Sequence, residues 1–149
     1  MRIPAATLAA VLIFGATGAA AQTEDWRLLA QDGPVDVAVD VASFSGPPDR
    51  RTVRSAMVSR EEDDPFAYLI VDVVIDCTAR TISAEAMSAR DVGGAVLRQQ
   101  DLPPETAPVN EADGTAATAR AACEGAEISQ TRFESAPAFA AWAMARRSG

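Results

Sequence analysis

A two-residue alternation of apolar and polar side chains is the feature that most constrains the fold of this chain. In the segment 35–44, VDVAVDVASF, valine occupies every second position from 35 to 41, with aspartate or alanine between. Successive side chains of an extended strand point to opposite faces, so this pattern predicts a strand with one buried face. A longer apolar run at residues 66–77, FAYLIVDVVIDC, predicts the central strand of the same sheet.

Both faces of the predicted strand at 66–77 are rich in apolar side chains. The odd positions from 67 to 77 form an unbroken apolar face, which we expect to lie on the core side. The opposite face carries Phe66, Tyr68, Ile70 and Val74 beside Asp72 and Asp76. This second face is too apolar for free exposure, so we expect a helix or another subunit to cover part of it.

The remaining elements define the fold class. Further strands are expected at residues 24–31, 51–60, 79–91 and 95–100, followed by a proline-rich connection at 101–110 and helices at 113–125 and 135–147. Strands this close together, without long helices between them, favour antiparallel pairing. We therefore predict an α+β fold: an antiparallel meander of five to six strands with one or two flanking helices and one disulfide.

The first twenty-one residues have the features of a signal peptide. Arg2 precedes an apolar segment that ends in small residues, and Ala19-Ala20-Ala21 matches the A-x-A cleavage pattern. Cleavage would leave a mature chain that begins at Gln22, divided into a sheet domain at 22–132 and a helical tail at 133–149. The product is expected to be periplasmic or secreted, without membrane insertion after signal cleavage.

The only two cysteines, Cys77 and Cys123, are predicted to form a disulfide. Exported chains pass through an oxidising compartment, where an even cysteine count favours a disulfide. A zinc site would need further ligands, and a redox-active pair would favour C-x-x-C spacing. The closed loop of about 47 residues corresponds to a stabilisation of about 4 kcal/mol.

Composition removes several classes of function. The chain has no histidine, which excludes Ser-His-Asp and Cys-His catalysis, and its net charge of −8 argues against a nucleic-acid partner. Asp72 and Asp76 share a strand face but lie about 13 Å apart, too far for a paired-carboxylate hydrolase site. The acidic segment 61–64 lacks the alternating ligands of a calcium loop. We therefore predict no catalytic, metal-binding or cofactor-binding residues and no cofactor.

The predicted helix at 135–147 supplies the candidate partner-binding residues. Ser135 is expected to cap its start. The preceding helix is expected to be capped by Asp113 or Thr115 and to end at Gly125. Phe139 and Trp142 are three positions apart and share a helix face. They either pack on the sheet or dock a protein partner, and both alternatives are open from the sequence.

Several short motifs resemble the surface-adhesin protein E family of Gram-negative bacteria. They are Trp26 in the first strand, an Asp-x-x-Ser step at 40–43, DCTART at 76–81, ARDVGGAVL at 89–97 and AACEG at 121–125. The resemblance implies an exported antiparallel sheet with a flanking helix and a disulfide between Cys77 and Cys123. It also implies binding to host matrix and plasma proteins, and formation of a homodimer.

These observations favour an exported, noncatalytic binding protein of the bacterial cell envelope with an unidentified protein partner. One alternative is a structural accessory subunit of an envelope assembly, docked through Phe139 and Trp142. Another is a hydrolase with a carboxylate site that includes Asp72 or Asp76.

Overall fold

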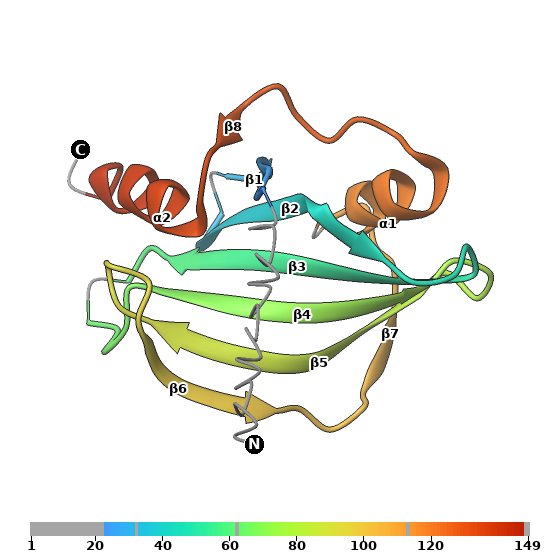
Figure 1. Ribbon diagram of the computed structural model, residues 1–149, viewed down its shortest axis with the longest axis horizontal. Coiled ribbons are helices and arrows are strands. Elements are labelled where there is room, and N and C mark those ends of the chain that lie inside the picture. Colours follow the sequence, from blue (N-terminus) through green and yellow to red (C-terminus); the bar gives the residue numbers. More distant parts are fainter. Residues whose placement is uncertain (1–22, 32, 62, 113, 148–149) are drawn as a thin grey trace, which may run out of the picture.

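The computed structural model describes residues 23–31, 33–61, 63–112 and 114–147, so the predicted signal peptide lies outside the described residues. One antiparallel sheet has the strand order β6-β5-β4-β3-β2-β1-β8, and β7 also pairs with β5 (Figure 1). The strands are β1 Trp26–Ala30, β2 Val35–Ser45, β3 Arg50–Ser59, β4 Tyr68–Asp76, β5 Thr81–Arg90, β6 Val96–Asp101, β7 Thr106–Pro108 and β8 Arg132–Phe133; the helices are α1 Thr115–Glu124 and α2 Ala136–Ala145. The predicted α+β meander with two helices is confirmed.

The described residues form eight strands, more than the five to six expected, because the sequence did not reveal the very short strands β7 and β8. β7 lies in the proline-rich connection, where Thr106 pairs with Ser83 of β5. β8 consists of two residues, which pair with Trp26 and Arg27 of β1. Strands of two or three residues are too short to show a period-two pattern, so alternation could not reveal them.

The two helices cover opposite faces of the sheet. Ala38 and Val39 are neighbours in β2 and both are fully buried, yet Ala38 packs with α2 and Val39 packs with α1. We name the two surfaces the α2 face and the α1 face. The helices also lie towards opposite ends of the strands (Figure 1). Each helix therefore covers one part of its face and leaves another part open.

The second apolar face of β4 was expected to be covered by a helix or by another subunit, and a helix covers it. Tyr68 and Ile70 pack against α2, whereas Val71, Val73 and Ile75 belong to the cluster under α1. The alternation does not extend to residues 66 and 67, because the chain bends there before β4 begins at Tyr68. Ala67 consequently packs with the α2-face cluster, whereas the prediction placed it on the same face as the other odd-numbered positions of the strand.

The disulfide joins Cys77, directly after β4, to Cys123 in the last turn of α1, with Cα atoms 5.8 Å apart. This confirms the predicted pairing. Gly125 ends α1 in the left-handed conformation, as expected. The start of α1 differs: Gly114 is the N-cap, and the Thr115 hydroxyl accepts a hydrogen bond from the Asn110 N–H. The other expected cap, Asp113, lies outside the described residues.

The segment 133–149, predicted as a separate tail, contributes to the core over its described part. The Ser135 hydroxyl caps α2 by accepting a hydrogen bond from the Ala138 N–H at 3.2 Å. Phe139 is fully buried in a cluster that includes Trp26 and Tyr68. β8 and α2 therefore complete the α2 face of the sheet.

Removing the disulfide with Cys77→Ala and Cys123→Ala should lower the free energy of unfolding by about 4 kcal/mol, because the unfolded chain regains the entropy of an open loop. Urea denaturation of both proteins measures the difference. Reductant should destabilise the wild type and leave the double variant unchanged. Equal stability of the oxidised wild type and the variant would contradict a stabilising disulfide.

Phe139→Ala should destabilise the protein by about 3–5 kcal/mol, since it removes a fully buried ring and leaves a cavity under α2. Ala141→Ser, at an exposed position of the same helix, is the matched control and should change stability by less than about 1 kcal/mol. Urea denaturation compares the two. Similar losses in both variants would show that helix propensity, rather than core packing, determines the effect.

Candidate functional site

The residues singled out in the sequence have structural contacts. Cys77 and Cys123 are bonded to each other. Phe139 has no exposed surface, and its ring centroid lies 6.2 Å from that of Trp142. The Trp142 ring is covered by the Arg146 guanidinium, 4.6 Å from its centroid. The aromatic pair thus packs on the sheet, and Phe139 offers no side-chain surface to a partner.

The two strand carboxylates are held by unrelated contacts. Asp72 lies in register with Arg54 of β3, whose Nε is 3.3 Å from the carboxylate oxygen. Asp76 accepts hydrogen bonds from the N–H groups of Thr78 and Ala79, at 3.0 and 2.7 Å, and so closes the turn after β4. The described residues contain no group of three or more His, Cys, Asp or Glu side chains that could hold a metal ion.

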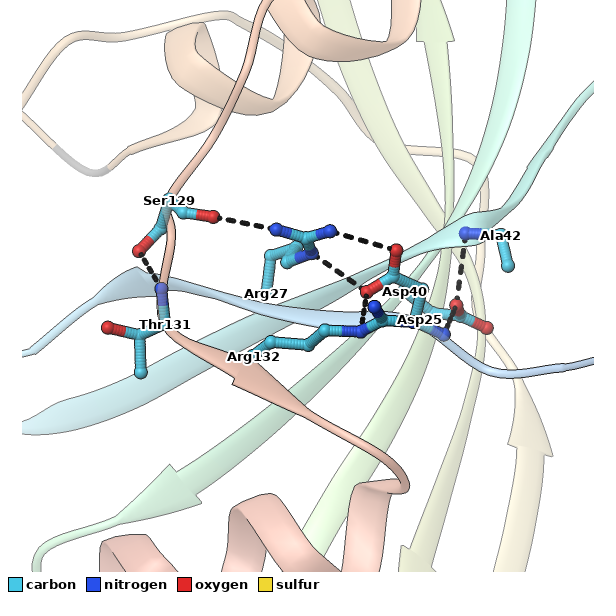
Figure 2. Close-up of polar contacts among 7 residues, drawn as sticks. All are labelled: Asp25, Arg27, Asp40, Ala42, Ser129, Thr131 and Arg132. Carbon is cyan, nitrogen blue, oxygen red and sulfur yellow. Dashed lines mark hydrogen bonds and ion pairs between the residues drawn. The ribbon is translucent and has the colours of Figure 1, made fainter.

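A polar cluster around Asp25 joins the first strand, β1, to the last strand, β8 (Figure 2). The Asp25 carboxylate accepts hydrogen bonds from Arg27 Nε and Nη2, at 2.7 and 3.1 Å, and lies 2.9 Å from Arg132 Nε. Arg27 Nη1 also donates to the Ser129 carbonyl at 3.1 Å. Chiefly because of the Arg27 hydrogen bond, the pKa of Asp25 is lowered from its ordinary value. The cluster fixes β8 and the preceding loop to β1.

Asp40 stabilises an irregularity at the end of β2. The residue is 4% exposed, and its carboxylate accepts hydrogen bonds from the N–H groups of Asp25 and Ala42 (Figure 2). The Ser43 hydroxyl donates to the Asp40 carbonyl at 2.6 Å and accepts from the Arg54 N–H at 2.9 Å. These bonds span the point where the β2–β3 register shifts. The Asp-x-x-Ser step therefore marks a bulge.

An apolar groove lies on the α1 face over the strands β4 to β6. We name it the β4–β6 groove; it has a volume of about 400 Å³ and is lined by Pro65, Phe66, Leu69, Met87, Ala89, Leu97, Arg98 and Gln100. The large apolar side chains most exposed among the described residues are Val92, Val96 and Leu97, at 68%, 49% and 55%. All three lie in or beside the turn that joins β5 to β6. Leu97 also lines the groove, and exposed apolar surface beside such a hollow favours a protein contact.

The β4–β6 groove lies beside an open strand edge, and exposed acidic side chains precede two of its lining residues in the chain. β6 ends the strand path, so its outer backbone groups have no strand partner within the described part of the chain. An open edge can pair with an additional strand. Glu61 and Asp63 are exposed in the turn that leads into Pro65 and Phe66. The sequence showed this acidic turn. It did not show that the turn leads into residues of an apolar groove, because the groove forms only when β5 pairs with both β4 and β6.

No family model, curated protein or solved structure matches the chain. Among the described residues, none of the helices has the length and apolar character needed to cross a bilayer.

Asp25→Asn should lower stability at neutral pH by about 1–2 kcal/mol, because it weakens charge-assisted hydrogen bonds to Arg27 and Arg132. The lowered pKa means that the ionised carboxylate stabilises the folded state above the ordinary value of 3.8. This contribution should disappear as the pH falls below 3.8 through the folded-state pKa. Urea denaturation at several pH values, with the exposed Asp49→Asn as control, measures it; a difference between wild type and Asp25→Asn that persists at the lowest pH would contradict it.

Proposed function

We propose that the chain is an exported, noncatalytic binding protein of the bacterial cell envelope, periplasmic or secreted, that binds another protein through the β4–β6 groove and the edge of β6. One observation supports this above the others. The exposed apolar side chain of Leu97 lines an apolar groove that lies beside an open strand edge. Addition of a partner strand to such an edge is a recurring mode of peptide recognition.

The chemistry of the groove suggests an extended partner segment with alternating apolar and basic side chains. Backbone groups of that segment would pair with β6, and every second side chain would lie on the α1 face beside the groove residues that β6 contributes, among them Leu97. Basic side chains would face Glu61 and Asp63. The net charge of −8 would also speed the approach of a basic partner at low salt.

Other features support the proposal less directly. The disulfide suits an exported protein. Asp72 contacts an arginine and Asp76 closes a turn, so neither carboxylate suggests hydrolysis. An accessory subunit that docks through Phe139 and Trp142 is less well supported, because both side chains pack within the chain. Kinship with the adhesin E family would add host matrix and plasma proteins to the candidate partners.

The test is affinity purification of tagged protein from intact envelopes under nonreducing conditions. Leu97→Asp places a charge in the groove, and Val92→Asp places the same charge on the adjacent turn, outside the groove lining. We expect Leu97→Asp to reduce recovery of the partner at least about tenfold, since it would bury an unpaired charge, while Val92→Asp retains it.

The purified partner should then bind the wild type directly, with an affinity that falls as salt rises. Equal recovery by Leu97→Asp and wild type would overturn the groove as the binding surface. Recovery that depends on Trp142→Ala instead would favour the accessory role. Capture of a second copy alone would replace the foreign partner with a homodimer.

A further inference from the structure

A second hollow, on the α2 face, has a different chemical character from the β4–β6 groove. This pocket has a volume of about 360 Å³ and lies where α2 begins. Its wall includes Glu24, Arg54, Tyr68, Arg90, Gly94 and Pro137. The volume is in the range of small-ligand sites, and its polar groups come from the N-terminal segment, three strands and a turn.

Tyr68 is the first observation that points to a ligand. Only 2% of the residue is exposed, and its hydroxyl makes no hydrogen bond to any of the described residues. The hydroxyl oxygen itself is not fully enclosed by the protein, so it can donate a hydrogen bond to a molecule in the pocket. A Cβ atom on Gly94 would lie 3.2 Å from this hydroxyl, so glycine at that position keeps the pocket wall beside it open. Burial raises the pKa of Tyr68, and the hydroxyl therefore remains a proton donor at neutral pH.

Two arginines add positive charge to the same pocket. Arg90 Nε donates to the Ser88 hydroxyl and Arg90 Nη1 donates to the Gly94 carbonyl, both at 3.1 Å. These bonds fix the guanidinium and leave Nη2 without a partner among the described residues. Arg54 contacts Asp72 through Nε, which leaves its terminal nitrogens available. The first turn of α2 contributes the positive end of the helix dipole.

We infer that this pocket binds the carboxylate of a small organic acid, with the Tyr68 hydroxyl and Arg90 Nη2 as donors to its oxygens and Arg54 as a further positive charge. Glu24 restricts which small organic acids the pocket can bind. Its Oε2 accepts a hydrogen bond from Trp26 Nε1 at 2.8 Å, and its other oxygen remains an acceptor at the wall. A hydrogen-bond donor next to the ligand's carboxylate would bind this second Glu24 oxygen. The negative charge of Glu24 would repel a doubly charged anion. The ligand class is thus an α-hydroxy or α-amino acid. This inference is independent of the proposed protein contact.

The test is a calorimetric titration of the full mature chain with L-lactate, L-alanine, acetate and inorganic phosphate. We expect saturable binding of L-lactate or L-alanine, weaker binding of acetate, and still weaker binding of phosphate. Tyr68→Phe keeps the ring and removes only the hydroxyl, and it should weaken binding about tenfold, the effect of losing one hydrogen bond to a charged group. Arg90→Gln should weaken it further.

Arg120→Gln, on α1 and outside the pocket, is the matched control and should bind as the wild type does. Thermal unfolding of each variant verifies that it is folded. Should Arg90→Gln fail to fold, the Tyr68→Phe comparison still decides the outcome. Absence of saturable binding by L-lactate and L-alanine, or equal affinity in Tyr68→Phe, would overturn the inference. Phosphate binding as tight as that of L-lactate would overturn the assignment to a carboxylate.

Discussion

The structure depends on burying both faces of β4. This central strand carries Tyr68 and Ile70 on one face and Val71, Val73 and Ile75 on the other, and neither set can remain in water without a large loss of hydrophobic stabilisation. An antiparallel sheet with a single helix would cover only one of them. The chain therefore needs α1 and α2 on opposite faces, and each helix is held in place differently. A disulfide joins α1 to the end of β4, whereas Phe139 and Trp142 pack α2 into an aromatic cluster with Phe133.

The offset between the helices determines where binding surfaces can exist. Because each helix covers one part of its face, the rest of each face remains open, and the two open parts differ in chemistry. The α1 face presents apolar side chains beside the free edge of β6. The α2 face presents two arginines, a glutamate and a tyrosine hydroxyl. One sheet thus carries the surface that we propose for an extended protein segment and the pocket that we propose for a small charged ligand.

Polar contacts complete the fold where apolar packing ends. The Asp25 cluster binds β8 to β1, and the buried Asp40 carboxylate satisfies backbone N–H groups at the bulge in β2. Unpaired N–H groups at such a bulge would be costly to bury. The same bulge lies close to Arg54, whose backbone N–H is bonded to Ser43. The hydrogen bonds that pair the backbone groups of the bulge therefore also hold the backbone of Arg54, a candidate ligand-binding residue.

The sequence by itself determined the fold class, the six longer strands, the two helices and the disulfide. These features follow from local period, capping residues and a cysteine count of two, none of which needs distant contacts. Only the tertiary structure decided the short strands β7 and β8, the bend before Tyr68, and the packing of the tail into the core. It also decided the sites, because Glu24, Arg54, Tyr68 and Arg90 lie far apart in the sequence and meet only through the register of paired strands and the placement of α2. Register and helix docking are long-range properties of the packed chain, which no local pattern specifies.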